Sequence, residues 1–542
     1  MTLPLSARLL GTAAVAALAA AAPARATTLG EAIAYAYETN PGLQAQRAAL
    51  RALDESYVQA RTGYGLQISA QISATNTDLS NNSPVNPVTG QSAVPGANTN
   101  TSNQGVSLAL PIWTGGRVKQ RVTQAEAQIR LGRQNLRRFE LDLLTRVVSA
   151  YVSVRRDEQL LKISQDTIVV LEKQVSDNEA KFKVRQLTAT DVAQAKARLA
   201  QSRSTLAAIQ AQLAVSRAQY LAAVGQNPVD LAPPPQLESL PETIDKAFDT
   251  AEANNPQILA AVFGEQGSRA RVAEAKAGRL PSVSARLDFQ RAPYVSFQPA
   301  LGVNETRVGS ITLSQPIFTS GQISSGIRQT TEENNRDRLN IDEQRLQVTQ
   351  AVASAWEQLA ASRKQLATFG DEARADEFAF YGVRQEERFA LRSTIEVLNA
   401  QLELTNAQQN VVRARAQEYA GRAQLLAAVG TLDARMFAPT APVYDMAANL
   451  RRVKDSGATP LEAPVRFLDN ALSPTVGPQR PAAIAIAHPG GAVLPPTPDA
   501  ETPMASILST IEKTPPPQPV LGPTPPDVRT PPTVLAGPLK PN

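Results

Sequence analysis

The stretch Pro111-Ile112-Trp113-Thr114-Gly115-Gly116 returns in nearly the same form as Pro316-Ile317-Phe318-Thr319-Ser320-Gly321. The two copies are offset by 205 residues (316 minus 111). The same offset separates Leu221-Ala222-Ala223-Val224-Gly225 from Leu426-Ala427-Ala428-Val429-Gly430. A constant offset over so long a stretch indicates a duplication rather than a chance match. We therefore predict two internal repeats, residues 27–232 and 233–438.

Each repeat contains segments with the alternation of a β-strand. Leu66 to Ala74 alternates apolar with polar side chains, and residues 283–290 do the same, which predicts strands with one apolar and one polar face. Two more strands are expected at Val106–Leu110 and Val308–Ser314. Residues 78–104 and 291–307 lie between the paired strands and have the composition of exposed loops, the first being the longer.

A long proline-free run follows each copy of the opening motif. Arg117 to Lys183 is 67 residues long, or about 100 Å as a helix. Its apolar residues follow a heptad with one four-residue step, which locally unwinds a coiled coil, and the second half repeats the series. Shorter helices are predicted at Leu29–Tyr64 and Thr188–Val224, and again at Thr243–Ala277 and Thr394–Val429. Laid end to end, each pair matches the length of one long helix.

The first 26 residues have the pattern of an export signal. Arg8 precedes an apolar run from Leu9 to Ala22, and Ala24-Arg25-Ala26 fits a cleavage site. Residues 1–26 are therefore predicted to be a signal peptide. No later stretch is apolar enough for a transmembrane helix, so a place in the membrane would require strands. Four strands cannot close a barrel, so we expect several copies to share one; strand counting alone leaves two or three copies open.

The composition argues against an enzyme. The chain has no Cys, and its single histidine is His488 in a proline-rich region. Thiolate and most imidazole sites are thereby excluded. The net charge is +5 and the pI about 9.3, yet no basic run interleaved with aromatics suggests nucleic-acid binding. We predict a protein that is not an enzyme and has no cofactor, no metal and no nucleic-acid partner.

Two turn sequences carry a resemblance to a known family. Residues 182–192, from Phe182 to Asp191-Val192, resemble the F-x-V-G-x-x-[TA]-x-T-D-V turn of TolC-type outer membrane factors, and residues 393–400 resemble the S-T-x-[DE]-V-L-[DN]-A turn of their second repeat. The resemblance extends over roughly residues 27–434. It implies a mixed α and β fold: a homotrimer with a shared twelve-stranded transmembrane β-barrel, four strands per chain, on a long periplasmic α-helical barrel. The location implied is the outer membrane of a Gram-negative cell, with most of the mass in the periplasm.

In that family the helix tips close the periplasmic entrance. The resemblance places Thr190 and Asp191 on the first tip, Arg392 on an arginine that links neighbouring coils, and Glu396 on an acidic ring position. The second ring position is Asn399, which is not acidic, and Glu387 stands where a linking tyrosine is familiar. A ring of Glu396 carboxylates would favour cations and raise the pKa of at least one of them. The alternative is that Asp191 and Glu396 only cap their helices.

The function implied is the exit duct of a tripartite export system that passes type I secreted proteins, drugs or small molecules. Its partners would be a periplasmic membrane fusion (adaptor) protein, an inner-membrane ABC or RND-type transporter, and outer membrane lipid. One alternative is a dedicated multidrug efflux component. A more distant one is a periplasmic coiled-coil scaffold or adhesin stalk. Residues 439–542 are expected to form a largely disordered periplasmic tail, with a short helix near Tyr444–Lys454.

Overall fold

The computed structural model describes residues 27–79, 88–89, 97–237, 240–292, 304–439, 444–472 and 493–496. The chain divides into two compact units, Met1–Pro495 and Pro496–Asn542, and every named helix and strand belongs to the first. The predicted signal peptide, residues 1–26, lies outside the described residues, as do positions 80–87, 90–96 and 293–303 of the predicted loops.

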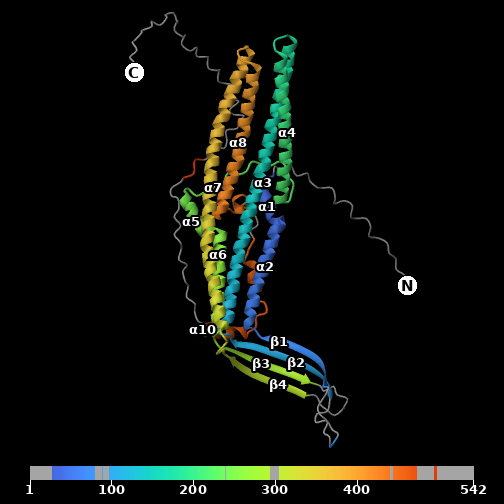
Figure 1. The fold of residues 1–542 in the computed structure, drawn as a ribbon, viewed down its shortest axis with the longest axis vertical. Coiled ribbons are helices and arrows are strands. Elements are labelled where there is room, and N and C mark those ends of the chain that lie inside the picture. Colours follow the sequence, from blue (N-terminus) through green and yellow to red (C-terminus); the bar gives the residue numbers. More distant parts are fainter. Residues whose placement is uncertain are drawn as a thin grey trace, which may run out of the picture. The chain divides into compact units, whose positions relative to one another are not determined.

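Two helical hairpins dominate the first unit (Figure 1). Helix α3, Arg117–Lys183, turns back into α4, Ala189–Val224, and α7, Gln322–Arg388, turns back into α8, Thr394–Val429. Both long helices have 67 residues and both return helices have 36. The predicted bounds of α3 are confirmed, and α7 repeats its length in the second half, where no proline interrupts the run either. Among the described residues, no helix combines the length and apolarity that a membrane span needs.

The heptad residues of α3 form the core between the helices. Ile129, Leu136 and Leu143 are each 1% exposed, and Val147 and Val154, beyond the four-residue step, are equally buried. Burying such a side chain stabilises the fold by about 1.5–3 kcal/mol. The helix continues through the step without a break. The heptad therefore marks the packing face of α3, as the sequence predicts.

The shorter helices correct the prediction of one continuous helix before each sheet. The first divides into α1, Leu29–Thr39, and α2, Pro41–Arg61, with a short 3-10 turn η1 at Thr62–Tyr64. The second divides into α5, Ile244–Asn254, and α6, Pro256–Ala277. Proline excludes the preceding residue from the helical region, and Asn40 is extended with ψ 116°. The asparagine before each proline caps the new helix, through Leu43 N in the first half (3.1 Å) and Gln257 N in the second (2.8 Å).

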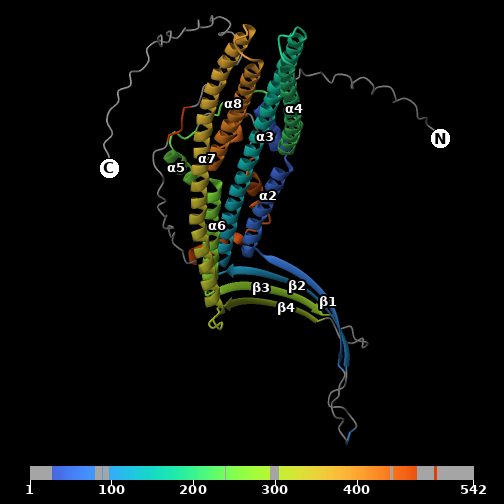
Figure 2. The same ribbon diagram turned by 45° about the horizontal axis from the view of Figure 1, so that its top comes forward.

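Four antiparallel strands form one sheet in the order β1-β2-β3-β4 (Figure 2). Their bounds are β1 Gln67–Leu79, β2 Ala97–Trp113, β3 Ser282–Ala292 and β4 Asn304–Ser314. The strands are longer than predicted, and residues 97–104 of the first expected loop belong to β2. The reason is backbone pairing, which continues from Ile72↔Gln104 out to Leu79↔Ala97 irrespective of side-chain polarity. Strands β1 and β4 are the two edges of the sheet.

The chain after the second repeat is partly ordered. Helix α9, Ala448–Val453, lies within the helix expected near Tyr444–Lys454. A further helix, α10, Glu462–Leu472, corrects the expectation that nothing beyond Lys454 is folded. The fully buried Asp469 carboxylate of α10 accepts hydrogen bonds from Thr114 N (2.9 Å) and Gly116 N (3.0 Å). It thus holds the turn between the end of β2 and the start of α3. The remaining tail, 473–492 and 497–542, lies outside the described residues.

Candidate functional site

The candidate site is the pair of turns at the helix tips, where α3 meets α4 and α7 meets α8. Arg185 and Ala390 adopt left-handed backbone conformations, with φ of 62° and 55°. Glycine is the usual residue there, because a Cβ costs about 1–2 kcal/mol in this conformation. A backbone hydrogen bond spans the left-handed residue in each turn, from Gln186 N to Lys181 O (2.9 Å) and from Leu391 N to Glu386 O (3.0 Å). The tips thus keep the same geometry without glycine.

On the first tip, Asp191 acts as a helix cap. Its Oδ2 accepts from Thr188 N (2.9 Å) and from Thr188 Oγ1 (2.7 Å), while Asp191 N donates to Thr188 Oγ1 (3.2 Å). This reciprocal arrangement is a capping box. The hydrogen bonds from Thr188 lower the pKa of the Asp191 carboxyl below its usual range. The neighbouring Thr190 is exposed at the start of α4.

On the second tip, Glu396 caps α8 and also meets Arg392. Glu396 Oε2 accepts from Ser393 N (2.9 Å), and Arg392 lies 3.5 Å from Glu396 Oε1 and 2.8 Å from Glu386 Oε2. The backbone hydrogen bond from Ser393 and the nearby arginine lower the pKa of the Glu396 carboxyl. In the single chain both tip carboxylates are therefore caps. The rise in pKa expected from a ring concerns an assembly of chains and stays a prediction.

Two polar contacts join one hairpin to the other near the tips. Lys181 Nζ of α3 lies 2.5 Å from Glu387 Oε1 of α7, and Arg198 of α4 donates to Asn399 Oδ1 of α8 (3.1 Å). Of the six residues placed here by resemblance, Glu387 and Asn399 thus reach the other hairpin, whereas Arg392 bonds within its own. Among the described residues, no ion pair joins Asp191 to Arg392.

Sequence reasoning missed Lys181 and Arg198. The repeat offset gives no signal for these contacts, because the residue equivalent to Lys181 is Glu386, which pairs with Arg392 (2.8 Å). Glu387, one residue further on, contacts Lys181. The contact depends on how the two hairpins lie side by side.

The tips also expose large apolar side chains. Val184 is 64% exposed, Phe389 75% and Leu391 73%. Phe182 is 46% exposed on the same tip as Val184. Scattered apolar residues are normal on surfaces, but a cluster at the ends of two hairpins is typical of a protein-binding surface.

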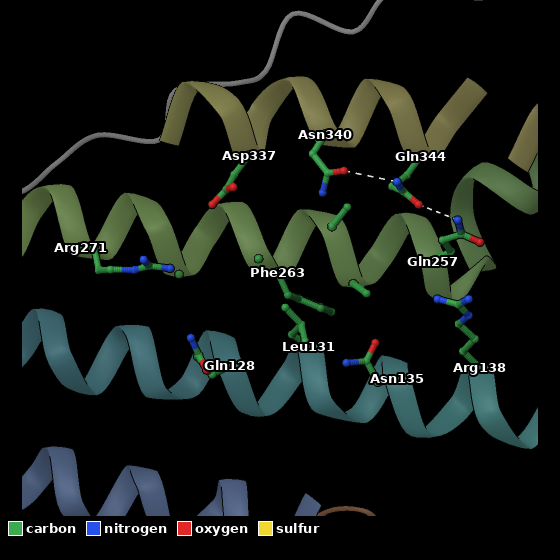
Figure 3. A pocket seen from close by; sticks show the side chains of 14 residues that line it. Gln128, Leu131, Asn135, Arg138, Gln257, Phe263, Arg271, Asp337, Asn340 and Gln344 are labelled. Carbon is green, nitrogen blue, oxygen red and sulfur yellow. Dashed lines mark hydrogen bonds between the residues drawn. The ribbon is translucent and has the colours of Figure 1, made fainter. Parts of the chain in front are cut away.

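A groove of about 450 Å³ lies further along the bundle, between α3, α6 and α7 (Figure 3). Gln257 Nε2 donates to Gln344 Oε1 (2.5 Å) and Gln344 Nε2 to Asn340 Oδ1 (3.3 Å) across its wall. The lining combines amide side chains, two arginines, Arg138 and Arg271, and one carboxylate, Asp337, with apolar residues and glycines, and it has no histidine. In the described part of the chain, no group of three or more His, Asp or Glu side chains could hold a metal ion. The groove thus mixes polar and apolar surface, and its one carboxylate, Asp337, is paired with Arg336.

The hairpins and the four-stranded sheet define the fold of outer-membrane channels. A solved structure of the outer-membrane channel OprN matches with a TM-score of 0.64 at 19% identity, covering 74% of this chain and 90% of that one. The outer membrane protein VceC from Vibrio cholerae matches with a TM-score of 0.63 at 19% identity, covering 74% and 96%.

The family follows from the sequence itself. The model of the outer membrane efflux protein family matches residues 32–226 and 247–431, so the chain belongs to that family. The Outer membrane efflux protein BepC of Brucella suis is 28% identical over 428 residues, which are 79% of this chain and 91% of that protein. The Alkaline protease secretion protein AprF of Pseudomonas aeruginosa is 22% identical over 287 residues, 52% of this chain and 60% of that protein. The resemblance to TolC-type factors is thereby confirmed.

Proposed function

We propose that this protein is the exit duct of a tripartite export system, spanning the outer membrane as a homotrimer. One observation carries the proposal. In this member of the efflux family, the two 67-residue helices each follow a strand of one four-stranded sheet, and that sheet has two open edges. Family membership favours this duct over a periplasmic scaffold or adhesin stalk, which needs no such sheet.

The open edges argue for sharing the sheet between copies. Backbone groups on an unpaired strand edge cannot be left in lipid, where no water satisfies them. Four strands are too few to close on themselves, since membrane barrels begin at about eight. Three copies supply twelve strands. The helical hairpins would then form a periplasmic tunnel about 100 Å long.

The tip contacts support a closable entrance at the far end of the hairpins. Lys181–Glu387 and Arg198–Asn399 hold the two hairpins of one chain together. Thr190, Asp191 and Arg392 would face neighbouring chains in the assembled ring. Three copies of Glu396 around the axis would place acidic charge at the constriction and favour cations.

The exposed apolar tips support a periplasmic adaptor as the docking partner. Val184, Phe389 and Leu391 would be covered by the adaptor, which connects the duct to an inner-membrane ABC or RND-type transporter. Soluble proteins rarely expose large apolar patches to water, and burying these side chains against a partner would stabilise the complex. Most of the chain would then lie in the periplasm.

Two cargo classes are supported by different relatives. The name of BepC describes an efflux protein, and that of AprF describes secretion of an alkaline protease. A duct with an acidic entrance is compatible with small cations and with an unfolded polypeptide. Export of type I secreted proteins, of drugs and small molecules, or of both is the function we propose, with a dedicated multidrug efflux component as the second candidate.

Deletion of the gene tests the proposal. The culture supernatant and the minimal inhibitory concentrations of a drug panel are compared for the deletion strain, the same strain with the wild-type gene restored, and the parent. We expect loss of at least one secreted protein or increased drug sensitivity, reversed on restoration. Loss of secreted protein alone identifies type I secretion, and drug sensitivity alone identifies efflux. No change in either would overturn the proposed export function.

A further inference from the structure

The first half contains a seat for an extended segment beside its opening helix. Thr27, just before α1, forms a parallel bridge with Leu231, which follows α4. Tyr151 of α3 donates its hydroxyl to the Ala232 carbonyl (2.7 Å), and the Arg155 guanidinium donates to the Leu231 carbonyl. Leu231 is buried in the core. The segment after α4 therefore packs against the first half, to which it belongs.

In the second half, the segment after the return helix does not pack against its own half. The segment after α8 packs instead on the first half, where Leu432 and Phe437 belong to the same apolar cluster as Leu29 of α1. A distant piece of chain lies at the start of α5. Thr243, just before α5, forms an antiparallel bridge with Val493, which is the short red segment beside α5 in Figures 1 and 2.

Three contacts hold this distant piece. Besides the Thr243–Val493 bridge, Leu494 packs against the apolar cluster of the second half, which contains Ile244, Phe248 and Trp356. The buried Arg363 of α7 donates from a guanidinium nitrogen to the Pro495 carbonyl (2.9 Å). Arg363 is itself positioned by Glu418 of α8 (3.2 Å). One backbone bridge, one apolar anchor and one charged donor thus act on three successive residues.

The two seated segments have the same sequence character. Leu231-Ala232-Pro233-Pro234 and Val493-Leu494-Pro495-Pro496 each place two apolar residues before two prolines. Proline fixes φ and lacks a donor, so such a segment stays extended and offers only carbonyls beyond its apolar pair. Both seats supply donors to carbonyls of the seated segment. Arg155 and Tyr151 donate to the carbonyls of the apolar pair Leu231 and Ala232, and Arg363 donates to the Pro495 carbonyl.

We propose that the second half has a binding seat for an extended segment of two apolar residues followed by two prolines. The seat is formed by Thr243, the apolar cluster of α5, α7 and α8, and Arg363. Val493–Pro495 occupies the seat as a strap. Like the segment after α4 in the first half, the strap forms a bridge at the start of the opening helix of its half. Its contacts are separate from those of α10.

A designed disulfide reports the strap directly, because the chain has no cysteine of its own. Bridged residues of antiparallel strands have Cα atoms about 4.5–5.5 Å apart, within the range that a disulfide spans. The double variant Thr243→Cys/Val493→Cys of the full-length purified protein should therefore oxidise to an intramolecular disulfide, detected by mass after proteolysis. Pairing of Leu108→Cys with Leu287→Cys in the β2–β3 ladder serves as the positive control for oxidation.

Further substitutions in the Thr243→Cys/Val493→Cys double variant then test recognition by the seat. Leu494→Asp removes the apolar anchor, and Arg363→Met removes the donor while Glu418 keeps its partner Arg422 (2.5 Å). Each should slow disulfide formation by about tenfold or more. Leu461→Asp, the same change at an exposed leucine of the tail, should leave the rate unchanged. No disulfide while the positive control forms, or equal rates in all three variants, would overturn the strap.

Discussion

At the scale of single residues, Asp469 holds together parts of the chain that are far apart in sequence. It is 0% exposed and accepts from two backbone N–H groups of the turn before α3, those of Thr114 and Gly116, and from the Thr114 hydroxyl at 2.8 Å. A carboxylate at a helix N-terminus is favoured both by these donors and by the helix dipole. The junction between β2 and α3 thus depends on a helix from beyond the second repeat.

Replacing Asp469 with alanine should destabilise the protein by about 3 kcal/mol, because two buried backbone donors lose their acceptor. The measurement is the thermal unfolding midpoint of the detergent-solubilised protein, followed by circular dichroism. Asp455→Ala removes a carboxylate that is largely exposed in the same C-terminal segment and should change stability by less than about 0.5 kcal/mol. Equal midpoints for the two variants would contradict the role of Asp469 in holding the turn before α3.

The residue scale is also where sequence reasoning is weakest. The turn motifs place Asp191 and Glu396 correctly at the helix starts, and their capping is the local alternative that the sequence already offers. The contacts of Lys181 with Glu387 and of Arg198 with Asn399 depend on how the hairpins lie side by side. Nothing local in the sequence fixes that arrangement. The contacts of Asp469 could not be predicted for the same reason, because they depend on how α10 packs against the turn before α3.

At the scale of elements, local signals predict the helices well and the strands only in part. The absence of proline sets the length of α3 and α7, and a capping residue marks the start of α4. The break between α1 and α2 follows from Pro41, which the sequence also displays. The outer parts of β1 and β2 are fixed by pairing between distant residues, such as Asn76 with Asn100. Polar composition there predicts a loop, and pairing overrides it.

The contact between the two hairpins gives an element-scale prediction. Reversing either charge, as Lys181→Glu or Glu387→Lys, places like charges together where α3 meets α7 and should favour the open entrance. A partly exposed pair contributes about 1 kcal/mol at most, which shifts an equilibrium about fivefold. Each single variant should therefore show larger or more frequent openings in planar-bilayer recordings, and the double exchange should restore wild-type behaviour.

A matched control is available within one hairpin. Lys196 and Glu179 form an ion pair at 2.8 Å between α4 and α3, so Lys196→Glu disturbs a tip charge without affecting the link between hairpins. Its conductance should match the wild type. If Lys196→Glu opens the channel as much as Lys181→Glu does, general tip charge and not the inter-hairpin contact controls the entrance.

At the scale of the whole molecule, the duplication predicts how copies meet. Inside one chain β2 pairs with β3, and Leu108 lies opposite Leu287. The offset of 205 residues relates Leu108 to Leu313 of β4, and the offset of 215 seen at Asn40-Pro41 and Asn255-Pro256 relates Leu287 to Ile72 of β1. If neighbouring copies repeat the internal seam, Leu313 of one chain faces Ile72 of the next. Both side chains are exposed in the single chain, at 66% and 79%.

The central claim is that copies of this chain share one sheet around a closed ring of three. The most direct test is the double variant Ile72→Cys/Leu313→Cys, oxidised in outer-membrane fractions and resolved on a denaturing gel without reductant. Covalent species of two and three chains are predicted, with no larger ones, whereas Ile72→Cys/Thr312→Cys, which points one cysteine to the opposite face, should stay monomeric. A double variant that stays monomeric, or a ladder that continues beyond three chains, would contradict the claim.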